Sequence, residues 1–385
     1  VHLAASANVR FSVEEPHTVI RNNIVCFQVI LEQLRKITES GGVLPQFVWA
    51  SSSSVYGLNE KVPFESTDRV DRPASLYGAS KRMNEFQAQV YNHIFKIPIY
   101  LLKEKPDRII SWMSHANVIV GFFSFFFSKK KVIWNIRSSG DEYNLFNKNF
   151  LIYSLQSLLS YLVTEKVIYN SNYSKNNHTK LLINKKLGVV VYNGFKKQKI
   201  QNRNTKNEKL NFLCVARYHP IKNHLKLFKA FSLFNKDEKN WKLTLVGRDI
   251  FQLKKDFKEL LITNKILEKI SFIDEYQNLD KIYKRSDFHV LASDAESFPN
   301  VVGESMSHGV PAISVNVGDV RKMIFDKRLI CKKNNFYSMA NTLLQAKKIF
   351  KNKKDYNKLR QNCKDFIDKK FSLSKMIYQF KKHIN

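Results

Sequence analysis

Short runs of β-branched and aromatic residues alternate with helical stretches through the second half of the chain. Five of these runs are predicted strands, at residues 210–216, 241–246, 270–273, 288–291 and 311–315. Between them lie predicted helices, such as those at residues 225–234 and 253–262. Strands that alternate with helices form parallel, doubly wound sheets. We therefore predict an α/β fold built from Rossmann-like parallel sheets.

Three segments of the chain differ in character. Residues 1–102 carry clusters of serine and other small residues, and 103–192 alternate short apolar runs with basic turns. Residues 193–385 show the strand and helix alternation most clearly, after a polar connection at 196–209. A chain of 385 residues exceeds the usual size of one domain. We expect three domains with these boundaries.

The most apolar stretch is VIVGFFSFFF at residues 118–127, and three lysines follow it at 129–131. It is far shorter than the ~20 residues that a membrane-spanning helix needs. It is either a buried helix of an α/β domain or an interfacial helix with its basic flank on a membrane. Any membrane contact would then be peripheral.

The chain has 64 Lys and Arg against 33 Asp and Glu, which gives a net charge of +31. This charge has three interpretations: a compositional bias, attraction to anionic lipid or phosphorylated substrates, or nucleic-acid binding. Nucleic acid is the least favoured, because the lysines are scattered and no recognisable nucleic-acid-binding motif accompanies them. The four cysteines are widely spaced without a CxxC pair, so we expect no disulfide framework, no zinc site and a cytoplasmic setting.

The N-terminal segment carries a group of residues suited to oxidoreductase chemistry. An apolar run with four serines, WASSSSVYG, occupies residues 49–57, and Tyr77 and Lys81 follow at helical i, i+4 spacing. A neighbouring ammonium favours the phenolate, so the tyrosine can act as a base toward a sugar hydroxyl while hydride passes to a nicotinamide ring. A YxxxK pair alone is a weak signal, but the serine run strengthens it.

These residues, together with HLAA at 2–5, NVRFS at 8–12 and Asn23, resemble extended short-chain dehydrogenases, above all nucleotide-sugar 4-epimerases that act on UDP-glucuronate or similar sugars. The resemblance implies Ser52, Tyr77 and Lys81 as the catalytic triad and NAD as the cofactor. The family places its glycine-rich phosphate loop before HLAA and a substrate domain after the strand at 97–102. Neither is present here. We therefore expect a catalytically inactive epimerase fragment over 1–102, with the N-terminus of something larger missing before Val1.

Two groups in the C-terminal segment are suited to nucleotide-sugar binding. Arg217 and Lys222 fall at a strand-to-helix turn, where they could bind a diphosphate. Glu296 and Glu304 flank SFPNVVG, and Pro299 suits the start of a helix whose free N–H groups would bind an anion. The two carboxylates could accept hydrogen bonds from sugar hydroxyls. A glycosidase pair is the alternative, but one residue on a loop and one on a helix fits binding better.

Three turns accompany these groups. GVPA at 309–312 joins the predicted helix to the next strand, and VGD at 317–319 makes a turn at that strand's carboxyl end, where doubly wound folds bind ligands. NGF at 193–195 follows a strand, and we expect its glycine to allow a tight turn at an interdomain crossing.

Over about 103–385 these motifs and their order resemble retaining family-4 glycosyltransferases of the two-lobed GT-B type. The resemblance implies that Arg217 and Lys222 contact the diphosphate of a UDP- or GDP-sugar, that Glu304 binds ribose, and that no metal or other cofactor is needed. Glu296 would lie against the transferred sugar. Backbone contacts would come from Phe298, Asn300 and Val301.

The segments WMSHAN at 112–117 and WNIRSS at 134–139 resemble the acceptor-side lobe of the same family. The resemblance implies that His115 faces the cleft. Many relatives have a second histidine near the end of the WNIR strand, where this chain has Ser138 and Ser139. The group that orients the acceptor is therefore open at this point.

The favoured interpretation is a retaining, metal-independent glycosyltransferase that acts on a lipid-linked or saccharide acceptor for a surface polysaccharide. It would be cytoplasmic, with peripheral contact at the inner face of the membrane left open. The epimerase fragment stands where the family's first βα units belong, so we expect a fusion of two truncated genes or an incomplete sequence. Two alternatives remain: an NAD-dependent 4-epimerase, and an inactive fusion that acts as a basic peripheral binding protein.

Overall fold

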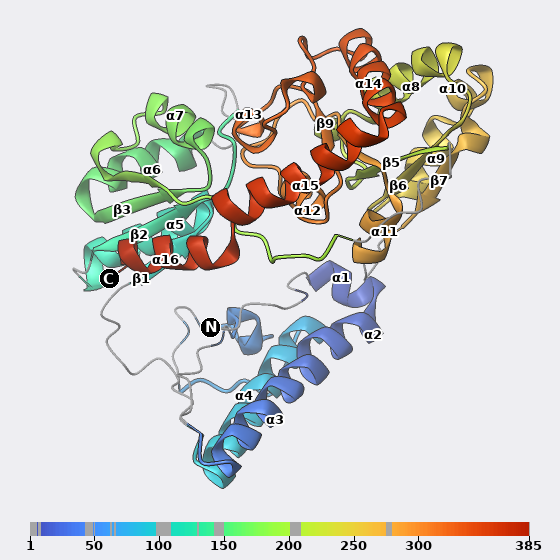
Figure 1. The fold of residues 1–385 in the computed structure, drawn as a ribbon. Helices are drawn as coiled ribbons and strands as arrows, with labels where there is room; N and C mark the ends of the chain where they lie inside the picture. The colour runs from blue at the N-terminus through green and yellow to red at the C-terminus, as the bar shows by residue number, and fades with distance from the viewer. Residues whose placement is uncertain are drawn as a thin grey trace. The chain divides into compact units, whose positions relative to one another are not determined.

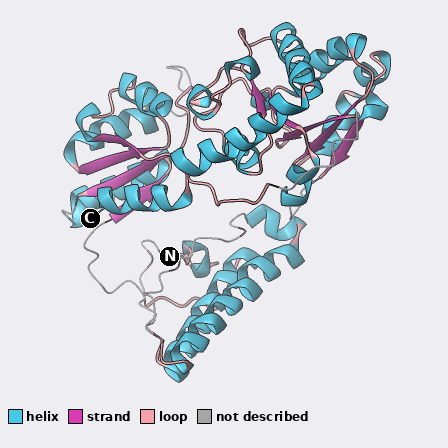
Figure 2. Ribbon diagram, in the orientation of Figure 1, coloured by secondary structure: helices cyan, strands magenta, loops and turns pink. Residues whose placement is uncertain are grey.

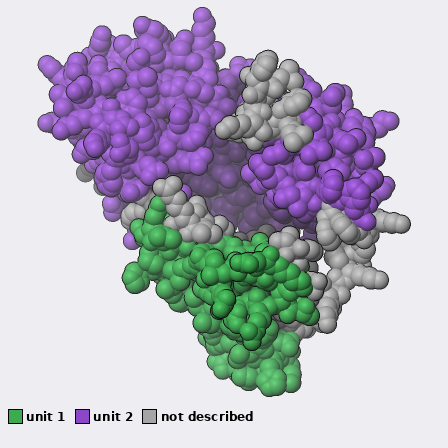
Figure 3. Space-filling view, turned by 180° about the vertical axis from the view of Figure 1, so that it is seen from behind, with its two compact units in different colours: residues 1–107 green, residues 108–385 purple. Residues whose placement is uncertain are grey.

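The computed structural model describes most of the chain in two compact units, Val1–Asp107 and Arg108–Asn385 (Figure 3). The described residues are 6, 9–42, 49, 51–61, 64, 67–97, 109–128, 131–141, 150–200, 209–274 and 279–384. The second unit contains both segments that the sequence analysis separates at residue 192. In Figure 3 it forms two masses with a recess between them.

The described part of the first unit is helical (Figure 2). Its two long helices, α3 and α4, pack through a core that contains Phe27, Leu31 and Tyr91. The strand expected over 1–5 lies outside the described residues, as does most of the strand expected over 97–102. The elements are α1 (Val9–Glu14), α2 (Pro16–Val19), the π-helical turn η1 (Ile20–Val25), α3 (Cys26–Glu39), the 3₁₀ turn η2 (Ser53–Tyr56) and α4 (Leu76–Phe95).

The first lobe of the second unit is built on a parallel four-stranded sheet in the order β1-β2-β3-β4 (Figure 1). The strands are β1 (Ile109–Trp112), β2 (Val132–Ile136), β3 (Thr164–Tyr169) and β4 (Gly188–Val190). The connections are α5 (Ser114–Phe123), the π-helical turn η3 (Ser124–Ser128), α6 (Phe150–Leu162), α7 (Asn172–Lys180) and the 3₁₀ turn η4 (Lys185–Leu187). Strand side chains alternate between faces, so Val132 and Trp134 pack with Leu159 of α6, while Ile133 faces the other side.

The apolar stretch at 118–127 forms the later part of α5 and most of η3. Val118 and Val120 pack against the sheet core, whereas Ile119, Phe122 and Phe126 are exposed. The expectation of a fully buried helix is therefore wrong for one of its faces, because no other described element covers these side chains.

The second lobe contains a parallel five-stranded sheet in the order β7-β6-β5-β8-β9, which confirms the five predicted strands. They are β5 (Leu210–Val215), β6 (Trp241–Val246), β7 (Ile270–Ile273), β8 (Phe288–Leu291) and β9 (Ala312–Ser314). The chain runs outward from β5 to β7 and then returns to β8 beside β5. Such a reversal opens a crevice at the carboxyl ends of the two central strands.

Helices cover this second sheet. The predicted helix at 225–234 lies within α8, whereas the one predicted at 253–262 is two helices that meet at Phe257. The elements are η5 (Pro220–Lys222), α8 (His224–Asp237), α9 (Ile250–Asp256), α10 (Lys258–Thr263), η6 (Leu267–Lys269), α11 (Leu279–Arg285), α12 (Asn300–Ser307), α13 (Val320–Met323), η7 (Lys327–Leu329), α14 (Phe336–Lys351), α15 (Lys353–Lys370) and α16 (Leu373–Ile384).

The C-terminal helix α16 returns to the first lobe, although the sequence analysis places it with 193–385. Its Met376, Phe380 and Ile384, spaced four residues apart, pack on the face of the first sheet that carries Ile133 (Figure 1). Such spacing gives a helix one apolar stripe, which the sheet buries. The first lobe is therefore completed by residues from the far end of the chain.

The two lobes are joined where residues 193–195 cross residues 371–373. The Phe195 N–H donates to the Phe371 carbonyl (2.8 Å), and the Leu373 N–H donates to the Phe195 carbonyl (2.9 Å). Gly194 is not in a left-handed conformation, so the expected tight turn is absent. A Cβ at Gly194 would instead lie 2.6 Å from the Leu373 Cα, so glycine permits the close crossing of the two segments.

Candidate active site

A cavity of about 830 Å³ lies between the two lobes of the second unit. The first lobe contributes Trp112, Arg137 and Asn170 to its wall, and α16 contributes an apolar side that includes Phe380. The second lobe contributes Glu296, Asn300 and Glu304. The cavity therefore combines residues that follow strands of both parallel sheets.

Glu296 and Lys222 form an ion pair at the crevice of the second sheet. Lys222 follows β5 and Glu296 follows β8, and these strands are neighbours. The Lys222 Nζ lies 2.6 Å from Glu296 Oε1, and both side chains are largely shielded from solvent. The structure thus joins two predicted site residues that are 74 positions apart in the chain.

The helix α12 places the remaining residues of the acidic motif. It begins at Asn300, directly after Pro299, as the motif predicts. Phe298 is buried and its ring lies near that of Phe195, with 6.2 Å between ring centroids. Asn300 is exposed at the helix start, and Val301 is partly buried.

Glu304 lies one turn further along α12, and its Oε2 accepts a hydrogen bond from the Tyr283 hydroxyl (3.1 Å). Burial and the nearby Glu304 carboxylate raise the pKa of Tyr283 well above its usual range, which keeps the phenol protonated as a donor. The tyrosine therefore orients the Glu304 carboxylate.

Arg217 is exposed, two residues after the end of β5. Among the described residues it has no ion-pair partner, and neither Arg217 nor Lys222 belongs to the cavity lining. Arg217 therefore shares the carboxyl edge of the second sheet with the Lys222–Glu296 pair, but the structure does not bring it into contact with that pair.

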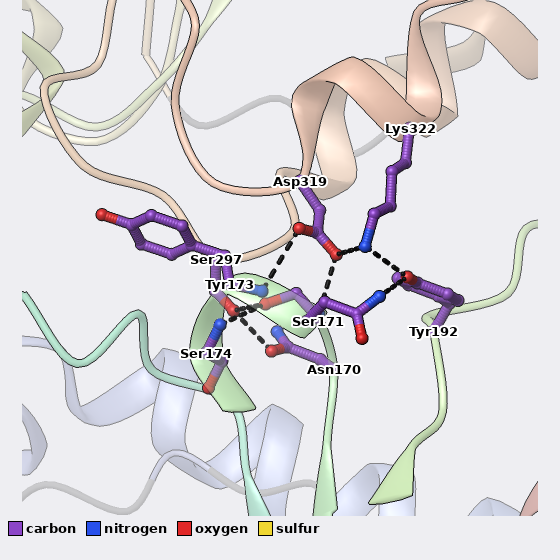
Figure 4. A network of polar contacts seen from close by, with 9 residues as sticks. Asn170, Ser171, Tyr173, Ser174, Tyr192, Ser297, Asp319 and Lys322 are labelled. Carbon is purple, nitrogen blue, oxygen red and sulfur yellow. Dashed lines mark hydrogen bonds and ion pairs between the residues drawn. The ribbon is translucent and has the colours of Figure 1, made fainter. Parts of the chain in front are cut away.

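A polar network connects the lobes beside the cavity (Figure 4). The Asp319 carboxylate accepts hydrogen bonds from the backbone N–H groups of Asn172 (2.7 Å) and Tyr173 (3.2 Å), at the start of α7. The Ser171 and Ser297 hydroxyls lie 2.7 Å apart. The VGD turn predicted as a ligand site therefore contacts the opposite lobe through its aspartate.

Gly318 in the same turn has φ +53°, in the left-handed region. A Cβ there would lie 2.3 Å from the Glu296 carbonyl oxygen. Glycine is thus required both by the backbone conformation and by the close approach of the loop that carries Glu296.

His115 lies in the first turn of α5 and is exposed, but it is not one of the residues that line the cavity. Ser138 and Ser139 stand where many relatives have a second histidine. In this chain His178 of α7 lies beside the first of them, with its Nε2 3.4 Å from Ser138 Oγ. Burial lowers the pKa of His178 to about 4, so its ring is neutral.

Sequence reasoning missed Trp112, Arg137 and the α16 wall as parts of this cavity. The motif WNIRSS at 134–139 predicts a strand and marks the two serines, but it assigns no role to Arg137. The signal that would have identified Arg137 was its place directly after the predicted strand, where ligands collect. No local pattern indicated that α16 would return to cover it.

In the first unit, the expected triad residues lie on two packed elements. Ser52 caps η2, where its Oγ accepts from the Ser54 N–H (3.2 Å). Tyr77 and Lys81 are buried in the first turns of α4, and burial lowers the pKa of Lys81. A Cβ at Gly78 would lie 2.5 Å from the Ser54 carbonyl oxygen, so the serine turn packs directly on the helix.

Within the described ranges, no cluster of three or more His, Cys, Asp or Glu side chains is placed to hold a metal ion. The helices that the structure describes include none with the length and apolarity to cross a membrane.

Comparison with protein families gives two separate matches. Residues 195–366 match the model of group 1 glycosyl transferases, and residues 1–103 match that of GDP-mannose 4,6 dehydratases. UDP-glucuronate 4-epimerase 3 of Arabidopsis thaliana is 48% identical over 99 residues, which are 26% of this chain and 22% of that protein. Protein CapI of Staphylococcus aureus is 46% identical over 98 residues, 26% of this chain and 28% of that protein. The chain thus spans only about a quarter of the length of these curated relatives.

Solved structures resemble the larger part of the chain. Anabaena HepE in complex with UDP has a TM-score of 0.62 at 14% identity, over 76% of this chain and 88% of that one. TarM of S. aureus, in a complex that contains UDP, has a TM-score of 0.61 at 13% identity, over 74% of this chain and 57% of that one. The second unit therefore has the two-lobed GT-B fold, and its residues 195–366 are similar to group 1 glycosyl transferases, after a dehydratase- and epimerase-like fragment at 1–103.

Proposed function

We propose that the second unit transfers a sugar from a UDP- or GDP-sugar to a saccharide or lipid-linked acceptor, with retention and without a metal ion. The observation that carries the proposal is the position of Glu296 and Glu304 in the wall of the interlobe cavity, at the crevice between β5 and β8. HepE and TarM, which share the fold, are solved with UDP.

The donor would be held by the second lobe. Its diphosphate would meet the first N–H groups of α12, which have no partner within the helix, and the cations Arg217 and Lys222. Glu304, oriented by Tyr283, would accept hydrogen bonds from the ribose. Glu296 would bind the transferred sugar.

Departure of the nucleoside diphosphate builds negative charge on its β-phosphate. Fixed cations and backbone N–H groups in a cleft that excludes water stabilise this charge more than water does. The residues at or directly after the ends of the first-lobe strands that line the cavity, Trp112, Arg137 and Asn170, include no carboxylate or hydroxyl that could act as a separate nucleophile. Same-face attack, in which the leaving phosphate accepts the proton of the acceptor hydroxyl, is the mechanism we favour.

Calorimetric titration of the full chain with UDP and GDP tests the donor site. We expect one of them to bind, and Glu304→Ala and Arg217→Ala to weaken binding at least tenfold, because each removes charge-assisted hydrogen bonds. Glu259→Ala and Arg285→Ala, at exposed positions of the same lobe, are the matched controls. Absence of nucleotide binding, or variants that bind like the parent, would contradict the proposal.

For the first unit we propose an inactive epimerase fragment that needs no NAD. The fragment keeps Ser52, Tyr77 and Lys81 but matches only about a quarter of the length of its relatives. Titration with NAD, followed by an assay for UDP-glucuronate epimerisation, tests this. Binding and turnover together would overturn it and favour the epimerase interpretation.

A second candidate role is contact with an anionic membrane surface. The helix α6 contains no charged residue, and its Leu158 and Tyr161 are 57% and 62% exposed. It packs beside α5, whose Phe122 is also exposed. In the sequence, three lysines at 129–131 follow the apolar stretch that contains Phe122. Apolar side chains flanked by cations are typical of interfacial helices.

Flotation with vesicles of equal parts phosphatidylglycerol and phosphatidylcholine tests this role. We expect binding to these vesicles, weaker binding to pure phosphatidylcholine, and loss of binding in Phe122→Asp with Tyr161→Asp. Phe251→Asp, at a 57% exposed site of the other lobe, is the control. Equal flotation of parent and double variant would refute the contact.

A further inference from the structure

Arg137 stands at the carboxyl end of β2, on the first-lobe side of the interlobe cavity. One guanidinium N–H donates to Asn193 Oδ1. The guanidinium carbon lies 5.4 Å from the ring centroid of Trp112 and 5.3 Å from that of Phe380. These three contacts position the side chain, and Arg137 is one of the residues that line the cavity.

No carboxylate in the described part of the chain neutralises the charge of Arg137. Among the described residues no carboxylate lies within ion-pair distance of it, whereas Arg328 is paired with both Asp326 and Asp355. An arginine carries five N–H donors, and Asn193 accepts from one of its nitrogens. Burial lowers the pKa of Arg137 to about 10, so the group stays charged at neutral pH in spite of that cost. A partly buried cation with open donors is suited to a bound anion.

The position of Arg137 separates it from the donor side. The side-chain amide of Asn193 donates a hydrogen bond to Asn300 Oδ1 (2.6 Å). Asn193 therefore lies between Arg137 and the start of α12. Glu296 belongs to the wall contributed by the second lobe. An anion on Arg137 would therefore lie on the acceptor side of the cavity, opposite the expected place of the transferred sugar.

Beside Arg137 the wall is apolar. Met376, Ile377 and Ile384 of α16 line it, and Trp112 is 44% exposed there. A ligand that fits this surface has an anionic group next to an apolar chain or to the apolar face of a sugar, which stacks on aromatic rings.

We propose that Arg137 binds an anionic group of the acceptor, a phosphate or a carboxylate, while Trp112 and Phe380 cover the adjoining part of the same molecule. This assignment rests on the proposed transferase function. Two kinds of acceptor carry such a group: a lipid-linked phosphate and a uronic acid. In both, anionic oxygens accept two hydrogen bonds from the guanidinium.

The test uses the full chain saturated with UDP or GDP, whichever binds, so that probes do not occupy the donor site. Four probes are titrated calorimetrically: geranyl phosphate and its neutral counterpart geraniol, and methyl glucuronide and its neutral counterpart methyl glucoside. We expect one anionic probe to bind and its neutral counterpart to bind at least tenfold more weakly. The anionic probe that binds identifies the source.

Variants of Arg137 then assign the site. Arg137→Gln should weaken binding of the anionic probe roughly tenfold to hundredfold, the range for hydrogen bonds to charged groups. Arg137→Lys should lose less affinity, because it keeps the positive charge. Arg285→Gln, at an exposed site, should bind like the parent. Thermal unfolding midpoints equal to the parent's show that each variant is folded.

Equal binding of charged and neutral probes, binding of no anionic probe, or unchanged binding by Arg137→Gln would overturn the assignment. A matching loss of nucleotide affinity in Arg137→Gln would also overturn it, because the arginine would then belong to the donor. If the parent binds neither UDP nor GDP, titration without nucleotide still tests Arg137, and only the transferase function fails.

Discussion

At the scale of single residues, buried histidines make the second unit sensitive to acid. Burial lowers the pKa of His178 to about 4 and that of His289 to about 3. Both values lie below the ordinary histidine pKa of about 6.5, which applies to the unfolded chain. The folded state therefore binds fewer protons than the unfolded state as the pH falls.

We predict that the free energy of unfolding is highest above pH 6.5 and decreases as the pH falls toward 4. From pH 7 to pH 5, each such histidine should remove about 2 kcal/mol, because protonation then favours the unfolded chain. Urea unfolding at several pH values measures this. His289→Gln should flatten the decrease, because it removes one of these two buried rings. A parent whose stability is constant between pH 7 and pH 5 would contradict the prediction.

Single residues also show how much of the candidate site could be predicted from the sequence. Glu296 and Lys222 could be placed together in advance, because they follow strands that a doubly wound sheet brings side by side. The place of Arg137 directly after a predicted strand is a local signal for the cavity, but its contact with the Phe380 ring could not be foreseen, because Phe380 comes from a helix more than 200 residues later. Local spacing carries no information about such a contact.

At the scale of elements, the close packing of α12 depends on one glycine. A Cβ at Gly303 would lie 2.1 Å from the Phe195 ring, which is far inside van der Waals contact. Phe195 belongs to the crossing between the lobes: its N–H donates to the Phe371 carbonyl, and its carbonyl accepts from the N–H of Leu373, the first residue of α16. The position of the acidic helix is thus coupled to the lobe crossing.

We predict that Gly303→Ala lowers the unfolding free energy by about 1 to 3 kcal/mol, the usual cost of overpacking. The overlap should outweigh the gain of roughly 1 kcal/mol that alanine brings to a helix. Denaturant unfolding measures the change, and Phe195→Leu added to Gly303→Ala should recover part of it, because the smaller side chain makes room. Stability equal to or above that of the parent would show that the ring can move freely.

The secondary structure of a segment was more predictable than the segments it packs against. Hydrophobic runs identified all five strands of the second sheet, because short buried parallel strands are nearly continuous apolar segments. The helix expected at 253–262 contains a break at Phe257 that periodicity does not reveal. The role of Gly194 was also misjudged, because a close crossing and a tight turn both require glycine.

At the scale of the whole second unit, Asp319 connects the two lobes. Asp319 is buried, and its carboxylate accepts hydrogen bonds from two backbone N–H groups at the start of α7, where the helix dipole favours a negative charge (Figure 4). Lys322 lies 3.2 Å from the same carboxylate. This charge therefore stabilises one relative position of the lobes.

We predict that Asp319→Ala lets the lobes separate more readily and increases the radius of gyration measured by X-ray scattering. Saturation with the bound nucleotide should reduce the difference if the donor is held between the lobes. Asp365→Ala, on the exposed face of α15, is the control. Scattering curves of Asp319→Ala that overlay those of the parent would rule out a role for this contact in lobe closure.

The return of α16 has a practical consequence for experiments on this protein. Ile384, the last residue of α16, lines the interlobe cavity, so a group attached directly behind this helix begins at the cavity rim. An affinity tag or fluorescent label attached there would compete with ligands for the opening and would lower apparent affinities. A label attached to the exposed surface of α9, on the other lobe, would leave the opening free.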